Sequence, residues 1–144
     1  MSNVSVEQAA EAAEIRQHLF WRIAEERGRQ DERWGQQNHP MTYPRGLFDT
    51  DYHGAIADMW KRENDCRVSR SKGRGIPDTE GCAWDGILAE EMHETFAETE
   101  PLKQAAEALQ AAGVAVAILE YLVRTHPEVR ELYTANPFAS GESR

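Results

Sequence analysis

The sequence predicts an all-α protein, a bundle of four or more helices that forms an oligomer. Apolar residues recur every three or four positions over long stretches, which is the period of an α-helix. No stretch of useful length alternates apolar and polar residues as a strand does, and no internal repeat is present. The 144 residues suffice for one domain, residues 1–144, with one modest core.

The first expected helix runs from Ser5 to Trp34. Ser5 suits the N-cap position, and Gln8 three residues later completes a capping box. The apolar stripe of this helix consists of Ala12, Ile15, Leu19 and Ile23. Residues 35–48 follow with two glycines and two prolines, so we expect a loop there.

Four further helices are expected, at Asp51–Ser69, Gly81–Glu98, Pro101–Arg124 and Pro127–Tyr133. Residues 71–79 between the first two of these hold two glycines and a proline, which indicates a flexible loop. Pro101 suits the first position of its helix, since the missing N–H costs nothing there. The polar residues 134–144 are expected to form a flexible tail.

The helix expected at Pro101–Arg124 is apolar on nearly every side. One stripe consists of Leu102, Leu109, Val116, Leu119 and Val123, and small residues such as Gly113 occupy other faces. A helix that is apolar all round is buried all round, and one short chain can hardly cover it. We therefore expect a homodimer or a dimer of dimers, with the functional site near the subunit boundary. The alternative is a core helix rich in Gly and Ala within a monomer.

Charge and composition limit the classes of partner. The net charge of −9 argues against a protein that coats a nucleic-acid polymer, but it permits binding of a small nucleotide. Cys66 and Cys82 lack the spacing of a redox or zinc pair and are expected to be free thiols. The chain opens without a secretory signal pattern, and the most apolar run, 108–119, is too short to span a bilayer. These observations predict a cytoplasmic protein without a membrane partner.

Acidic residues occur on the apolar face of the third expected helix. Glu91 follows Leu88 by three positions and Ile87 by four, and Glu94 follows Glu91 by three. Buried carboxylates need a counter-charge, because the desolvation of an unpaired charge is costly. With Glu107 on the next helix, these acids indicate a site for a hard divalent cation, Mg²⁺ or Mn²⁺.

The sequence EEMHE at residues 90–94, followed by EALQ at residues 107–110, resembles the signature of the MazG-like all-α nucleoside triphosphate pyrophosphohydrolases. In that family Glu-Glu-x-x-Glu precedes Glu-x-x-Asp. The match covers residues 82–123, and residues 29–40 also resemble a segment common in MazG-like proteins of bacteria and their phages. The resemblance implies the MazG-like fold, with Mg²⁺ held by Glu91, Glu94, Glu107 and Gln110. Gln110 stands where the family has Asp, so one negative charge is missing.

Three neighbours of these acids have open alternatives. Glu90 is either a base that orients the attacking water, a group that supports the metal ligands, or a surface acid. Glu98 either joins a second metal or is exposed near the end of its helix. His93 is expected to be exposed rather than to ligate a metal, because magnesium prefers oxygen ligands.

Two further groups of residues suit a nucleotide. Six of the sixteen basic residues lie between positions 61 and 74, and we expect phosphate contacts from Lys61, Arg62, Arg67 and Lys72. The alternative is a charged helix face with a flexible loop. Trp34 offers a stacking surface for a base, and Gln37 and Asn38 carry the donors and acceptors that a purine edge requires. The alternative for Trp34 is a core position at a helix end.

The resemblance implies a metal-dependent enzyme that hydrolyses a nucleoside or deoxynucleoside triphosphate to the monophosphate and pyrophosphate. We favour a purine deoxynucleotide, dGTP or dATP, in the control of a nucleotide pool such as that of a phage. The first alternative is a protein that binds nucleotides without turnover, because Gln110 replaces the Asp. The second is a helical dimerisation module with no ligand.

Overall fold

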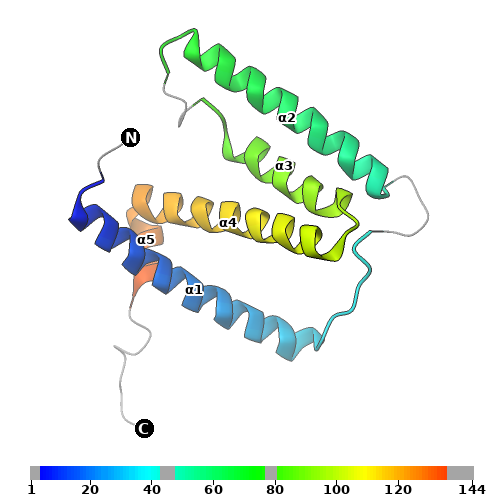
Figure 1. Cartoon of the computed structure of the whole chain (residues 1–144). Helices are drawn as coiled ribbons and strands as arrows, with labels where there is room; N and C mark the ends of the chain where they lie inside the picture. The colour runs from blue at the N-terminus through cyan, green and yellow to red at the C-terminus, as the bar shows by residue number, and fades with distance from the viewer. Residues whose placement is uncertain (1–3, 43–47, 77–80, 136–144) are drawn as a thin grey trace. The chain divides into compact units, whose positions relative to one another are not determined.

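The computed structural model describes residues 4–42, 48–76 and 81–135, and the regular secondary structure in these ranges is entirely α-helical (Figure 1). The helices are α1 (Val6–Trp34), α2 (Thr50–Lys72), α3 (Trp84–Ala97), α4 (Pro101–Thr125) and α5 (Pro127–Thr134). The predicted all-α class is therefore confirmed, and every expected helix is present. The tail predicted at 134–144 falls almost entirely outside the described residues, as do parts of both predicted loops.

The N-terminus of α1 has the predicted capping box. The Gln8 amide donates to Ser5 Oγ at 3.2 Å, and the Ser5 amide donates to Gln8 Oε1 at 3.0 Å. At the other end Gly35 adopts a φ of 66°, a left-handed conformation that favours glycine, and its N–H bonds Asp31 O at 2.8 Å. Local sequence signals thus determine both ends of this helix.

The limits of α2 and α3 differ from those expected. Asp49 caps α2 by accepting from the Tyr52 amide at 3.0 Å, and the helix continues three residues beyond Ser69. The start of α3 is Trp84 rather than Gly81, because the backbone is extended at Ala83, which offers no capping side chain. The ends of a helix without a side-chain cap are weakly specified by sequence.

The chain divides into two compact units, Met1–Gln37 with Val116–Arg144, and Asn38–Ala115. We call these the terminal unit and the central unit. The continuous helix α4 contributes its last part to the terminal unit and its first part to the central unit. The single domain predicted for residues 1–144 remains a prediction.

In the terminal unit, α1 packs against the end of α4 and against α5. Ile15, Leu19 and Val123 are buried together, and Leu119, Val129 and Tyr133 pack against them. Two residues of the predicted α1 stripe are thus in the core, whereas Ile23 is exposed. Ion pairs across the unit join Arg16 to Glu120 and Arg130 to Glu11.

In the central unit, α2 runs alongside α3 (Figure 1). Small residues lie at this contact, where a Cβ on Gly54 would be 3.7 Å from the Ala97 Cβ, an ordinary van der Waals distance. The helix α4 is tied to the end of α3 by Gln104, whose amide donates to Thr95 O at 3.2 Å and to Glu98 O at 2.9 Å. These bonds fix the turn between the two helices that carry the acidic motif.

Within one chain, helix α4 is not buried on all faces. Of its residues only Val123 is buried among those described, and Leu102 and Leu109 remain 82% and 74% exposed. The predicted homodimer or dimer of dimers remains a prediction.

The run at 108–119, expected to be too short for a bilayer, lies within a longer apolar helix. Among the described residues, α4 is the one helix whose length and composition suffice to cross a membrane. Core helices of soluble proteins have the same properties, so this observation is weak evidence for a membrane span. The cytoplasmic location and the absence of a membrane partner remain predictions.

Candidate metal centre

Three carboxylates from two helices meet in the central unit. Glu91 and Glu94 project from α3 and Glu107 from α4, and one oxygen of each lies within 4.8 Å of the others. All three residues are half-buried. The predicted grouping of these acids is thus present, with a geometry that could hold a metal ion; we call it the carboxylate cluster.

The electrostatics of the cluster are unfavourable without a cation. Burial raises the pKa of the Glu91 carboxyl, and the charges of Glu90 and Glu107 raise it further. Burial likewise raises the pKa of Glu94, followed by the charges of Glu91, Glu107 and Glu90, while Lys61 acts in the opposite direction. Converging acids in a partly desolvated site raise each other's pKa in this way.

One oxygen of the cluster has no partner. Glu91 Oε2 is buried, and no hydrogen-bond donor reaches it from the described residues. A buried acceptor without a donor costs about 1–3 kcal/mol, so such atoms call for an explanation. A hard divalent cation would satisfy this oxygen and offset the repulsion between the carboxylates, and an all-oxygen donor set suits Mg²⁺ or Mn²⁺.

Gln110 touches the cluster through Glu107. Its exposed amide Nε2 donates to Glu107 Oε2 at 3.3 Å, so the amide nitrogen of Gln110 faces the carboxylate. The Asp expected from the family signature would repel Glu107 here in the absence of a cation. Direct ligation of a metal by Gln110 remains a prediction.

A hollow of about 240 Å³ borders the cluster, and its acidic lining extends onto α2. It is lined by Gly54, Ala57, Asp58, Glu94, Ala97, Glu98 and Glu107. Asp58 was not expected here, since it belongs to no spaced acidic pattern. The only sequence signal for this position is that two small residues, Gly54 and Ala57, precede Asp58. They indicate a close helix contact only once it is known that α2 packs on α3.

Glu98 lies at this hollow but is partly engaged. Its Oε1 accepts hydrogen bonds from the backbone amides of Thr99 at 2.8 Å and Glu100 at 2.9 Å, and these bonds lower its pKa. One carboxylate oxygen of Glu98 therefore binds the backbone N–H groups of the turn that precedes α4. Its participation in a second metal site remains open.

Glu90 is half-buried and hydrogen-bonded to a side chain of α2, so it is not a free surface acid. Its Oε2 accepts a hydrogen bond of 2.7 Å from Asn64 Nδ2 on α2. Its charge acts on both Glu91 and Glu94, so it lies close to the cluster. The two remaining alternatives for Glu90, water-orienting base or support for the metal ligands, are both compatible with this position.

The expectation that His93 is exposed is wrong. His93 is half-buried, and its Nδ1 lies 2.8 Å from Nδ1 of His53 on α2. Burial lowers the pKa of His93, and the neighbouring His53 lowers it further. Phe96 stacks near His53 with ring centres 5.1 Å apart, so the pair belongs to an aromatic contact between α2 and α3.

The predicted phosphate-binding residues differ in their surroundings. Arg67 donates to Asp85 at 2.9 Å and to Glu63 at 3.2 Å, and its pKa is raised mainly by the Asp85 contact. Arg67 therefore joins α2 to α3 and would have to leave these partners to reach a phosphate. Lys61 lies near enough to affect Glu94, while Arg62 and Lys72 are exposed on α2. Phosphate contacts by all four remain predictions.

The alternative that Trp34 fills core space is wrong. Trp34 is 57% exposed at the end of α1, with the Arg33 guanidinium carbon 5.0 Å from its ring centre. Gln37 and Asn38 are also exposed. Trp34 and Gln37 belong to the terminal unit and the carboxylate cluster to the central unit, so base recognition by these residues remains a prediction.

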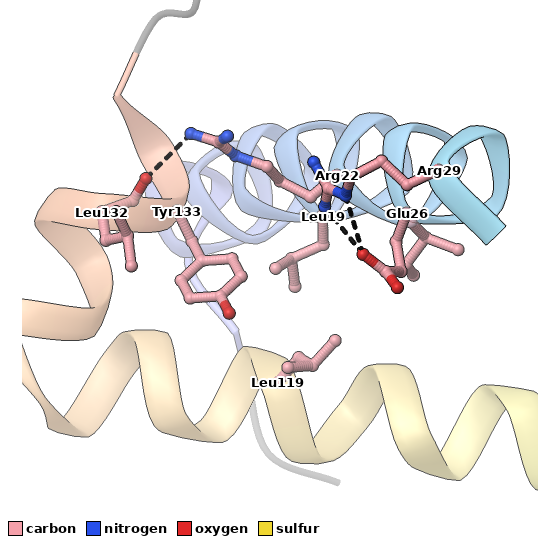
Figure 2. Close-up of a pocket in the computed structure, with 8 residues that line it drawn as sticks. Leu19, Arg22, Glu26, Arg29, Leu119, Leu132 and Tyr133 are labelled. Atoms are coloured by element: carbon pink, nitrogen blue, oxygen red, sulfur yellow. Dashed lines mark hydrogen bonds and ion pairs between the residues drawn. The ribbon is translucent and has the colours of Figure 1, made fainter. Parts of the chain in front are cut away.

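A second hollow, of about 390 Å³, lies in the terminal unit between α1, the end of α4 and α5 (Figure 2). It is lined by Leu19, Arg22, Ile23, Glu26, Arg29, Leu119, Leu132 and Tyr133. Arg22 donates to Leu132 O at 3.0 Å, and Arg29 donates to Glu26 at 2.8 Å. Because both of its cations already have partners, this hollow is a weaker candidate for an anionic ligand than the carboxylate cluster is for a cation.

No protein-family model matches the chain, and no curated protein or solved structure matches it either. The resemblance to the MazG-like family therefore depends on the acidic motif and on residues 29–40.

Proposed function

We propose that this protein is a divalent-cation-dependent pyrophosphohydrolase of nucleoside or deoxynucleoside triphosphates, with the MazG-like fold. The observation that carries the proposal is the convergence of Glu91, Glu94 and Glu107 within 4.8 Å, together with the buried Glu91 Oε2 that no described donor reaches. The spacing of these acids, which resembles the MazG-like signature, supplies the reaction class.

The residues have separate tasks in this reaction. Glu91, Glu94 and Glu107 would hold Mg²⁺ or Mn²⁺, with Gln110 either adding its amide oxygen or steadying Glu107. The bound cation would neutralise charge on the phosphate oxygens and acidify a water molecule. Lys61, which lies near Glu94, is the cation best placed to meet the remaining phosphate charge.

The bond changes follow from the products. A water oxygen bonds to the α-phosphorus, and the bond from that phosphorus to the oxygen bridging to the β-phosphate breaks. Pyrophosphate leaves with the bond electrons, and the proton of the water passes to a base. Glu90 is the carboxylate closest in sequence to the ligands that is not itself assigned to the metal, and we assign it this role.

The preferred substrate is a purine deoxynucleotide, dGTP or dATP, used in the control of a cytoplasmic nucleotide pool of a bacterium or phage. The exposed Trp34, with Gln37 and Asn38, would recognise the base. A partner copy that covers α4 would complete the assembly as a homodimer or a dimer of dimers.

A second candidate function is nucleotide binding without turnover. It is favoured by Gln110, which donates its amide to Glu107 instead of adding a fourth negative charge. A site with fewer charges binds divalent cations more weakly, because ligand charge contributes to affinity.

One experiment separates these functions. The protein is incubated with each common ribo- and deoxyribonucleoside triphosphate in the presence of Mg²⁺, Mn²⁺ or a chelator, and pyrophosphate is measured alongside calorimetric binding. Metal-dependent pyrophosphate release is the expected result. Nucleotide binding without release would support the second function, and the absence of both would reject the two together.

A further inference from the structure

Asn64 on α2 is one of two buried polar side chains among the described residues, with only 8% of its surface exposed. Its Nδ2 donates to Gly86 O at 3.1 Å and to Glu90 Oε2 at 2.7 Å, and its Oδ1 accepts from the Cys82 thiol at 3.2 Å. A side-chain amide has two N–H donors and one acceptor oxygen, so each group of Asn64 has a partner.

These partners also fix the orientation of the amide. With the oxygen and nitrogen exchanged, Asn64 Oδ1 would face the Gly86 carbonyl and the Glu90 carboxylate, which are both acceptors. Only one of the two orientations therefore satisfies the hydrogen bonds. The two acceptors, Gly86 O and Glu90 Oε2, therefore decide that the amide nitrogen of Asn64 faces Glu90.

The sequence of α3 makes room for this contact. A Cβ on Gly86 would lie 2.2 Å from Asn64 Oδ1 and 3.0 Å from an Arg67 guanidinium nitrogen. Such distances are far below van der Waals contact, so any side chain at position 86 would displace Asn64. Gly86 and Asn64 thus form one arrangement that brings an amide donor to the carboxylate of Glu90.

We propose that Asn64 is a positioning residue that holds Glu90 as the base of the hydrolytic reaction beside the carboxylate cluster. The inference rests on the proposed function. A hydrogen bond of this length to a carboxylate is strong, and it restricts a side chain that otherwise has three rotatable bonds. Holding Glu90 towards α2 also keeps it from joining Glu91 and Glu94 around the cation.

The choice of an amide suits this task. Lys or Arg at position 64 would neutralise the carboxylate and weaken it as a base, whereas a neutral donor fixes one oxygen and leaves the charge in place. Asn64 engages Oε2, so the proton of the attacking water would pass to Oε1. Small displacements of catalytic groups lower rates substantially, because reaction requires close alignment.

The test is a double-mutant cycle in turnover, made of Asn64→Ala, Glu90→Gln and the double variant. Loss of a general base costs about 100-fold or more, so this loss in kcat is expected for Glu90→Gln. Asn64→Ala is expected to lower kcat by about ten-fold, with KM and Mn²⁺ affinity within about two-fold of wild type. The double variant should be no slower than Glu90→Gln alone, because Asn64 acts through Glu90.

Two controls separate positioning from general damage. Cys82→Ala removes the contact to Asn64 Oδ1 but leaves the donor to Glu90, so its kcat should stay near wild type. Val123→Ala lowers the stability of the terminal unit without touching the cluster, and below its unfolding temperature it should retain full kcat. Asn64→Asp, which keeps the shape but removes the donor, should lose as much kcat as Asn64→Ala.

Two results overturn the inference and can be told apart. The first result is a wild type that releases pyrophosphate while the kcat losses of Asn64→Ala and Glu90→Gln multiply in the double variant, or while Asn64→Ala weakens Mn²⁺ binding as much as it lowers kcat. In that case Asn64 has no positioning role, but the proposed function stands. If wild type releases no pyrophosphate from any nucleotide, the proposed function fails and the role of Asn64 fails with it.

Discussion

Replacing Glu94 by Gln tests the carboxylate cluster both as a metal site and as a source of strain. The cluster places Glu94 within 4.8 Å of oxygens on Glu91 and Glu107, and two unit charges at that distance repel by about 1 kcal/mol even at the dielectric constant of water. Glu94→Gln removes two such pairs. We therefore expect the metal-free protein to gain about 1–2 kcal/mol of unfolding free energy at neutral pH, or roughly 3–6 °C in unfolding temperature.

The same substitution removes a proposed metal ligand, so excess Mg²⁺ should stabilise the wild type by binding and stabilise Glu94→Gln less. The wild type should then become the more stable of the two proteins. Glu94→Gln should also show no turnover. The assay is thermal unfolding with chelator and with Mg²⁺, accompanied by pyrophosphate release. Glu14→Gln, which removes one exposed negative charge from α1, is the matched control and should change neither property.

A Glu94→Gln variant that keeps metal-dependent turnover would refute the assignment of Glu94 as a ligand. A variant that unfolds at a lower temperature than wild type in chelator would refute the account of mutual repulsion. The two failures are independent, because the first concerns the cation and the second concerns the metal-free carboxylates.

Three further predictions concern pH, position 110 and assembly. The pKa of Glu94 is raised in the folded protein, so the folded protein binds the proton of this carboxyl more tightly than the unfolded chain does. The gain in unfolding free energy from Glu94→Gln should therefore be full above the raised pKa and shrink as the pH falls through it. Equal differences in unfolding free energy at every pH, measured by urea titration in chelator, would contradict this. Gln110→Asp should tighten Mn²⁺ binding and lower metal-free stability, because it places a charge against Glu107; calorimetry without tightening rejects the idea that the amide is a weak substitute. The exposed apolar residues of α4 predict a dimer whose stability depends on protein concentration and which Gly113→Glu disrupts, whereas light scattering that shows a stable, folded monomer at micromolar concentration would count against it.

Sequence patterns were sufficient for features within one helix or between consecutive helices. Glu91 and Glu94 are three residues apart, so the period of the helix alone places them together. The short turn after α3 then returns the chain so that Glu107 faces them. The capping box at Ser5 is similarly local, since both of its partners lie within one turn.

Contacts from α2 could not be predicted in this way. Asp58, Asn64 and His53 come near α3 only because of the particular faces on which the two helices pack, and Gly86 leaves the space that Asn64 occupies. A single helical periodicity shows which face of a helix is apolar, but not which residue opposes which. The aromatic surroundings of His93 and the support of Glu90 were missed for this reason.

The partner that would cover α4 could not be identified from the sequence. The composition of this helix indicates that one short chain can hardly cover it, and Leu102 and Leu109 are exposed in one chain. An apolar composition indicates that a helix surface is buried, but it does not show whether the same chain or a second copy buries it. Both arrangements have the same sequence pattern, so the oligomeric state needs a prediction of its own.

The central claim is that the carboxylate cluster directs water to the α-phosphorus of a nucleoside triphosphate. The most direct measurement is phosphorus NMR of the products formed from dGTP with Mg²⁺ in oxygen-18 water. We expect deoxynucleoside monophosphate that carries the heavy oxygen, unlabelled pyrophosphate, and no reaction in the presence of chelator. Label in pyrophosphate, release of orthophosphate as the first product, or cleavage that proceeds without a divalent cation would contradict the account.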